Sequence, residues 1–149
     1  MDKRSLLLEV YATFHKSGQL VDRACEGTGI TPEDFAFVSI VGGREPVTPS
    51  EIAREFGLSL STVLFRATRN VELGFVERLD NPDDGRSFLL RLTPKGRSAW
   101  RAAGERLHRL VTSLEKRLDR PAEEIQEALL ALQAAFDSEL ADSKEPVRR

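Results

Sequence analysis

Residues 74–96 have the sequence GFVERLDNPDDGRSFLLRLTPKG, and this stretch decides the fold. Phe75 to Leu79 form a short run with strand character, and Asn81 to Gly85 carry strong turn chemistry. Phe88 to Leu92 form a second strand run. The pattern predicts a β-hairpin whose charged tip carries Arg86. A hairpin this short cannot bury a core alone, so we expect its role to be the presentation of that tip.

Helix signals stand on both sides of the hairpin. Thr48-Pro49-Ser50-Glu51 is a capping box, which predicts a helix over Ser50 to Phe56. Ser59 predicts the start of a second helix, which should end at Gly74. Thr93-Pro94 predicts a further helix directly after the hairpin. Two helices joined by a tight turn with glycine, followed by a hairpin, are the parts of a winged helix-turn-helix.

The helix that follows Ser59 has two different sides. Its apolar stripe, at helical spacing, consists of Leu60, Val63, Leu64, Ala67 and Val71. The opposite side carries Ser61, Thr62, Phe65, Thr68, Arg69 and Glu72, with Arg66 towards the edge. This distribution predicts one face on a core and one face available to a nucleic-acid groove.

Residues 48–96 resemble the DNA-binding half of the MarR family of winged-helix regulators. The resemblance rests on the helix Gly57 to Gly74 and on three motifs: Gly74-Phe75-Val76-Glu77-Arg78, Pro82-Asp83-Asp84-Gly85-Arg86 and Leu92-Thr93-Pro94-Lys95-Gly96. It implies a homodimeric transcription regulator, a ligand-responsive repressor, with each reading helix in a major groove of a pseudo-palindromic operator. The chain departs from the family at Arg66 and Asn70, where apolar residues are usual, and at Phe65, where a polar residue is common.

The DNA contacts implied by this resemblance lie on two elements. One is the helix that follows Ser59, which we call the reading helix, and the other is the hairpin, which we call the wing. The predicted contacts are Ser61, Thr62, Phe65, Arg66, Arg69 and Arg86, and Asp84 is predicted to support the wing. Two of these residues have alternative readings. Arg86 can instead be a solvated charge paired with Asp84, and Phe65 can instead pack on the wing or on the helix that follows it.

The flanking segments predict a helical dimerisation region built from both termini. Helical patterns extend over Ser5 to Cys25, Phe35 to Val41, Pro94 to Leu118 and, after Pro121, to Leu140. The fold class is therefore mainly α with a small β-hairpin wing, in a single domain over 1–149. Its predicted parts are a winged helix-turn-helix lobe (44–97), a dimerisation region (1–43 and 98–142) and a tail (143–149). Leu114 and Leu132 are candidate residues of the dimer seam.

Composition narrows the class of protein. The net charge is −2, and residues 44–97 contain nine positive and eight negative side chains, which predicts modest non-specific affinity for DNA. One cysteine fits a reducing compartment, and we expect a cytoplasmic chain without membrane helix or signal peptide. No catalytic constellation is present, so an enzyme is not expected, and neither a cofactor nor a metal is predicted. His15 and His108 are expected at the surface or the dimer face.

Regulation has two candidate inputs. In the family, aromatic residues near the junction of the first and fifth helices can line a cavity for a small aromatic effector. The residues in that region are Tyr11, Phe14, Phe37 and Trp100, although Tyr11 and Trp100 can equally be core residues. Cys25 continues an apolar stripe, which favours a buried, inert thiol over a redox sensor. The alternative function is a winged-helix protein-interaction module that binds a partner protein through the wing and Phe65.

Overall fold

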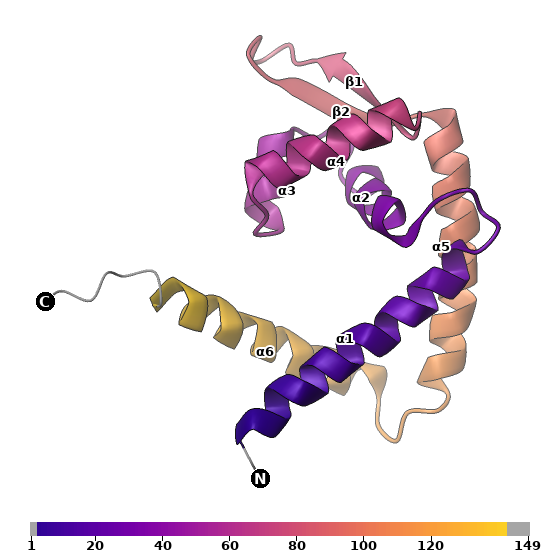
Figure 1. Cartoon of the computed structure of the whole chain (residues 1–149), viewed down its shortest axis with the longest axis vertical. Helices are drawn as coiled ribbons and strands as arrows, with labels where there is room; N and C mark the ends of the chain where they lie inside the picture. Colours follow the sequence, from indigo (N-terminus) through magenta and orange to yellow (C-terminus); the bar gives the residue numbers. More distant parts are fainter. Residues whose placement is uncertain (1–2, 143–149) are drawn as a thin grey trace, which may run out of the picture. The chain divides into compact units, whose positions relative to one another are not determined.

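A computed structural model describes residues 3–142 of the chain, so the predicted tail over 143–149 lies outside the described residues. Within residues 3–142 the chain forms six helices and one pair of strands (Figure 1). In chain order these are α1 (Lys3–Cys25), α2 (Pro32–Gly42), α3 (Pro49–Glu55), α4 (Leu60–Glu72), β1 (Val76–Asp80), β2 (Phe88–Leu92), α5 (Pro94–Glu115) and α6 (Ala122–Asp142). The predicted fold class is confirmed. Among the described residues, those up to Leu110 form one compact unit and those from Val111 to Asp142 belong to a second.

Local hydrogen bonds fix the starts of α3 and α4. The Glu51 N–H donates to Thr48 Oγ1 over 3.2 Å, and the Thr48 N–H donates to Glu51 Oε2 over 2.8 Å, which completes the capping box. The Thr62 N–H donates to Ser59 Oγ over 3.1 Å and caps α4. Gly57, with φ of +61°, turns the chain between the two helices, in a conformation that favours glycine. The predicted helix-turn-helix is confirmed, with both helices ending slightly earlier than expected.

The hairpin has one face on the core of the first unit. Its antiparallel register runs from Val76 opposite Leu92 to Asp80 opposite Phe88. Leu90 is fully buried. Val47 adds a single bridge to this edge of the hairpin, because its N–H donates to Leu90 O over 3.2 Å and its carbonyl accepts from the Leu90 N–H over 2.8 Å. This bridge, which the sequence did not predict, attaches the segment before α3 to the base of the wing.

The helix α2 lies in the core of the winged helix. Phe37, Val38 and Val41 on α2 are fully buried, and α2 contacts α1, α4 and β2. A helix with apolar residues on all sides is expected to be buried on all sides, and the sequence FAFVSIV fits that description. The predicted lobe boundary at residue 44 placed α2 in the dimerisation region, whereas its buried side chains belong to the winged-helix core.

The buried face of α4 agrees only in part with the predicted stripe, because Val63, Ala67 and the half-buried Val71 pack on the core but Leu60 and Leu64 do not. The buried residues of α4 are Val63, Ala67 and Asn70. Leu60 and Leu64, which were predicted to face the core, are exposed large apolar residues. The physical reason is that α4 turns its smaller side chains towards α2, so that Asn70 reaches a polar partner there. The helix is therefore rotated relative to the orientation that apolar periodicity predicted.

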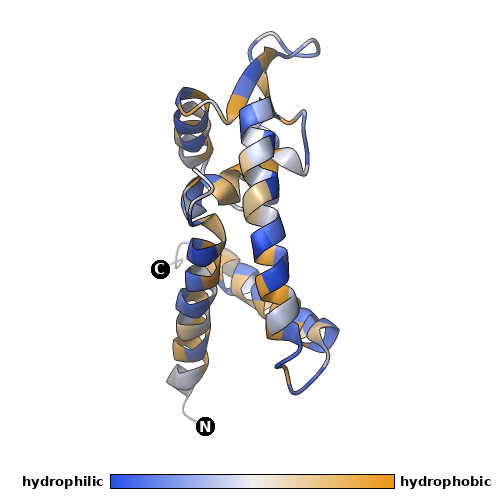
Figure 2. Ribbon diagram, turned by 90° about the vertical axis from the view of Figure 1, so that its right-hand side faces the viewer, coloured by the Kyte–Doolittle hydropathy of each residue, from blue (hydrophilic) through white to orange (hydrophobic). Residues whose placement is uncertain are grey.

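The long helices carry apolar residues that the single chain leaves exposed. Leu7, Tyr11 and Phe14 on α1 are exposed, as are Leu114 on α5 and Leu129 on α6. Figure 2 shows apolar residues recurring along α1, the helix that begins near the N label. The start of α5 is fixed in the first unit, since the Trp100 Nε1–H donates to Ser39 Oγ on α2 over 3.1 Å.

Among residues 3–142, no helix has both the length and the apolar character that crossing a membrane requires.

The junction between β1 and α5 generates a stability prediction. A Cβ atom at Gly96, in the first turn of α5, would overlap the Phe75 carbonyl, and backbone on both sides prevents relief. Gly96→Ala should therefore lower the free energy of unfolding by about 1–3 kcal/mol, the usual cost of overpacking. Urea denaturation monitored by circular dichroism measures this, with an unchanged slope indicating a simple stability effect.

The control for this prediction is Gly104→Ala in the same helix. A Cβ atom there meets nothing within 4 Å, so alanine should stabilise the protein by about 0.5–1 kcal/mol through helix propensity. Equal effects of the two substitutions would contradict the close approach of α5 to β1.

Candidate nucleic-acid interface

Three hydroxyl groups lie together at the start of α4. Ser59 Oγ is 3.0 Å from Ser61 Oγ and 2.7 Å from Thr62 Oγ1. Ser61 is exposed and Thr62 is half-buried. Helix N-termini favour negative charge because their first N–H groups have no partner within the helix. The predicted contacts Ser61 and Thr62 therefore stand at an accessible end of α4 that suits phosphate oxygens or base acceptors.

Phe65 is presented to solvent on α4. Its side chain is 71% exposed, so Phe65 does not pack closely on the wing or on α5. Leu64 and Leu60 on the same helix, and Phe56 after α3, are also exposed. These exposed apolar side chains of the helix-turn-helix can make van der Waals contact with thymine methyl groups or with another protein.

The tip of the wing is held by its own short-range hydrogen bonds. The Arg86 N–H donates to Asp84 Oδ1 over 3.0 Å, and the Ser87 N–H donates to Asp84 O over the same distance. Asn81 Nδ2 donates to Ser87 Oγ over 2.7 Å and joins the two sides of the loop. Asp84 therefore shapes the turn through the backbone of Arg86. Within residues 3–142 the Arg86 side chain has no ion-pair partner, so the pairing of its guanidinium with Asp84 is not observed.

Most other cations of the winged helix already have partners inside the fold. These partnerships are Arg44 with Glu55 (2.5 Å), Arg69 with Asp34 (2.9 Å), Arg91 with Glu77 (2.7 Å), Arg97 with Glu45 (2.6 Å), Arg78 with Thr68 (2.9 Å) and Lys95 with the Leu73 carbonyl (2.6 Å). In the described part of the winged helix, Arg54 and Arg86 are the arginines whose guanidinium groups form neither a hydrogen bond nor an ion pair. The count of charged residues in the sequence did not show how few of these cations lack a partner inside the fold.

Arg69, a predicted DNA contact, forms a two-point ion pair with Asp34 of α2. Arg69 Nε donates to Asp34 Oδ1 over 2.9 Å and Arg69 Nη2 donates to Asp34 Oδ2 over 3.1 Å. Thr31 Oγ1 and Asn70 Nδ2 also donate to the same carboxylate. Burial on its own raises the pKa of Asp34, but the hydrogen bonds from Arg69, Thr31 and Asn70, with the charge of Arg69, lower it below the ordinary value.

Arg66 is half-buried at the edge of the interface. Its guanidinium lies 3.9 Å from the Glu33 carboxylate, a loose ion pair. Its carbonyl accepts from Asn70 Nδ2 over 3.0 Å. The sequence pattern predicted the second helix only from Phe35, and it predicted no contact between Asp34 and the residues Arg69 and Asn70 of the reading helix. The available signal was Asn70 itself, a polar residue on the side of α4 that faces the core.

The four aromatic residues predicted to line an effector cavity do not converge in the first unit. Phe37 is fully buried in the core, while Tyr11 and Phe14 are exposed on α1, where each ring contacts the His15 ring. Trp100 alone of the four borders a described hollow, of about 360 Å³, with Arg101, Gly104, Glu105 and His108. In the single chain the four side chains do not share one cavity, and an effector pocket lined by them stays a prediction.

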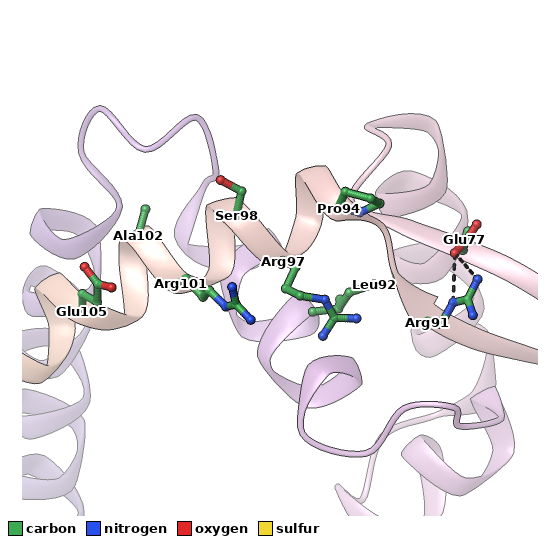
Figure 3. A pocket seen from close by; sticks show the side chains of 9 residues that line it. All are labelled: Glu77, Arg91, Leu92, Pro94, Arg97, Ser98, Arg101, Ala102 and Glu105. Atoms are coloured by element: carbon green, nitrogen blue, oxygen red, sulfur yellow. Dashed lines mark hydrogen bonds and ion pairs between the residues drawn. The ribbon is translucent and has the colours of Figure 1, made fainter.

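A larger hollow, of about 780 Å³, lies where the wing meets α5 (Figure 3). Arg97 and Arg101 from α5 and Arg91 from β2 line it, and Arg91 is paired with Glu77. No predicted site residue borders this hollow. Its charge is mixed, because Glu77 and Glu105 line it as well.

Cys25 lies in a buried position, and the two histidines lie at the surface of the chain. Cys25 is buried, and desolvation with the nearby Asp22 charge raises the pKa of its thiol, which favours the unreactive form. His15 and His108 are both exposed. Among the described residues no three His, Cys, Asp or Glu side chains are arranged to hold a metal ion.

The sequence is similar to proteins of the MarR family. The sequence model of the MarR family matches residues 28–87, from the loop before α2 to the wing tip. The Multiple antibiotic resistance protein MarR of Escherichia coli is 28% identical over 102 residues, which cover 68% of this chain and 68% of that protein.

Solved structures share the fold. The Mycobacterium tuberculosis transcriptional regulator MOSR, solved in complex with DNA, superposes with a TM-score of 0.75 at 20% identity, covering 89% of this chain and 96% of that one. Staphylococcus aureus MarR, solved with salicylate and kanamycin, superposes with a TM-score of 0.73 at 15% identity, covering 93% and 92%. These likenesses establish the winged-helix fold over nearly the whole chain.

The Asp34 ion pair generates a prediction about acid stability. Because the folded-state pKa of Asp34 is lowered, its contribution is complete above the ordinary aspartate pKa of about 4 and is lost as the pH falls through the lowered value. Asp34→Asn should lower the free energy of unfolding by about 1–3 kcal/mol at neutral pH. This difference from wild type should shrink below about pH 4. Urea unfolding at a series of pH values measures it.

Glu55→Gln is the matched control. It also removes a carboxylate opposite an arginine, but both partners of that pair are about half exposed, so its effect should be much smaller. A difference between wild type and Asp34→Asn that stays constant from neutral to strongly acid pH would show that the carboxylate charge is not responsible.

Proposed function

We propose that this chain, which belongs to the MarR family, is a transcription regulator that binds double-stranded DNA as a homodimer. The observation that carries the proposal is the pairing of two accessible elements. One is the exposed side of α4, with Ser61, Thr62 and Phe65, and the other is a wing whose Arg86 has no ion-pair partner within the described residues. We assign α4 to the major groove and Arg86 to the neighbouring minor groove, where narrow A·T-rich segments attract arginine.

The likeness to a regulator solved with DNA supports this assignment. In the simplest form of the proposal, the chain acts in the cytoplasm as a repressor on a pseudo-palindromic operator. Because so few cations of the winged helix are uncommitted, binding should depend on a small number of phosphate contacts and on the fit of α4 to the bases. We therefore expect sequence-selective binding with a shallow salt dependence.

A second function has one specific observation in its favour. The exposed apolar side chains Phe56, Leu60, Leu64 and Phe65 on the helix-turn-helix also suit a protein partner. The two functions differ in their response to salt. DNA binding through phosphates weakens as salt rises, whereas an apolar protein contact does not.

An effector is a further part of the proposal. Staphylococcus aureus MarR was solved with salicylate, and Trp100 borders the hollow on α5 described above. We propose that a small aromatic molecule binds at Trp100 and alters DNA affinity, with reciprocal weakening of the molecule by DNA. The buried Cys25 thiol makes oxidation the weaker candidate for the input.

The wing prediction follows from the uncommitted charge of Arg86. With a duplex recovered by the wild-type protein from a randomised library, Arg86→Ala should weaken binding by about 1–3 kcal/mol. The slope of log affinity against log salt should fall by about one if the contact is to a phosphate. Fluorescence anisotropy at several salt concentrations measures both quantities.

Arg101→Ala, which removes an exposed arginine of α5 outside the wing, is the control and should bind like the parent. If Arg86→Ala binds with the parent's affinity and salt slope, the wing does not meet DNA. If the wild-type protein recovers no duplex at all, the protein-interaction function takes precedence.

Exposed apolar residues on the long helices generate the assembly prediction. The intact chain should sediment as a dimer at micromolar concentration, and footprints should show half-sites about 10 bp apart, one helical turn. Leu114→Glu should shift the protein towards monomer because it places a charge in the predicted seam, whereas Leu132 is half-buried and a less direct test. The neighbouring exposed residue gives the control Ser113→Glu. A wild-type monomer that still protects two half-sites would contradict the prediction.

A further inference from the structure

A buried carboxylate joins α2 to the reading helix at two adjacent positions. Asp34 lies in the first turn of α2 and its side chain is 2% exposed. Its Oδ1 accepts from Arg69 Nε and from Asn70 Nδ2 (3.3 Å), while its Oδ2 accepts from Arg69 Nη2 and from Thr31 Oγ1 (2.7 Å). The carboxylate thus receives four hydrogen bonds, three of them from α4.

Arg69 and Asn70 donate to the Asp34 carboxylate from different sides of α4. Consecutive residues of an α-helix are about 100° apart around its axis. Arg69 reaches Asp34 from the exposed flank, with its side chain 46% exposed, whereas Asn70 is buried. A planar guanidinium bound at two points fixes direction as well as distance. Because Arg69 and Asn70 project in different directions from the helix axis and both bind the Asp34 carboxylate, their contacts oppose rotation of α4 about its own axis.

Apolar packing alone specifies this rotation weakly. Apart from Asn70, the buried residues of α4 are Val63 and Ala67, which are small. The larger Leu60 and Leu64 are 45% and 37% exposed, so only part of each side chain packs on the fold, and Val71 is half-buried. The buried position of Asn70 is energetically unfavourable in one respect, because its Oδ1 is desolvated and has no hydrogen-bond partner among the described residues. Buried polar groups with such a cost can select one arrangement of packed helices.

We propose that Asp34 and Arg69 are positioning residues that fix the rotation of α4 and thereby select which of its side chains face the DNA bases. This inference rests on the proposed DNA-binding function. It changes the role of Arg69, which the sequence suggested as a DNA contact. Arg69 is instead committed to Asp34, at the opposite end of α4 from Ser61 and Thr62, and it acts on the bases through the orientation of those residues.

The first test compares substitutions that the two roles of Arg69 separate. Asp34→Asn keeps the shape and the acceptor for Thr31 but removes the charge opposite Arg69. Arg69→Lys keeps a positive charge for a phosphate but loses the two-point geometry. For the positioning role, each variant should weaken binding to the selected duplex roughly ten-fold, within the range for single interface changes. The salt slope should be unchanged, and the double variant should be no weaker than either single variant.

The second test measures the base preference of the protein, which a loss of stability alone does not change. Duplexes are selected from a randomised library separately with wild type, Asp34→Asn and the control Glu55→Gln, each shown to be folded by circular dichroism. Asp34→Asn should recover a changed or relaxed base preference although Asp34 is buried away from the exposed side of α4. Glu55→Gln should recover the wild-type preference.

Each outcome bears on the inference in one direction. Unchanged or tighter binding by Asp34→Asn, or full affinity in Arg69→Lys, would mean that Arg69 contacts phosphate, and the positioning role would be overturned. An unchanged base preference in folded Asp34→Asn would overturn it as well. Failure of the wild-type protein to select any duplex is a separate result, which removes the proposed function and this inference with it.

Discussion

The burial of α2 against α4 and β2 is the constraint on which the functional surface depends. Phe37, Val38 and Val41 of α2 are fully buried, and they belong to the same apolar core cluster as the buried residues of α4 and β2, so the reading helix and the wing share one core. The helix caps and turns determine where each element begins, but they do not determine how the elements face one another. That orientation comes from α2, through apolar contacts along its length and through the Asp34 carboxylate in its first turn.

Signals within four residues of each other were readable from the sequence, and contacts between distant segments were not. The Thr48 capping box, the Ser59 cap and the Asp84 turn are local, and each was predicted correctly. The Val47 bridge to Leu90 and the Asp34 pair with Arg69 join segments far apart in the chain, the latter separated by 35 residues. Apolar periodicity placed Val63 and Ala67 inside correctly, but it also placed Leu60 and Leu64 there and left out Asn70, because the pattern of apolar residues carries no sign of the polar contact between Asn70 and Asp34.

The same distinction applies to charge. The sequence gives nearly equal numbers of positive and negative side chains between residues 44 and 97, which by itself describes only a weakly charged lobe. The structure assigns most of those arginines to carboxylates within the fold. Arg86 is different because its backbone N–H, and not its guanidinium, satisfies Asp84. The wing thereby gains a rigid tip without neutralising the cation that the tip carries.

The close approach of Gly96 to Phe75 has a mechanical consequence. Thr93 Oγ1 donates to the Gly74 carbonyl over 2.6 Å, and the Thr93 N–H donates to the Phe75 carbonyl over 3.0 Å. Lys95 Nζ donates to the Leu73 carbonyl just after α4. These contacts join the end of α4, the start of β1 and the start of α5 at a single junction. A displacement of the start of α5 would therefore be passed directly to the end of the reading helix and to the base of the wing.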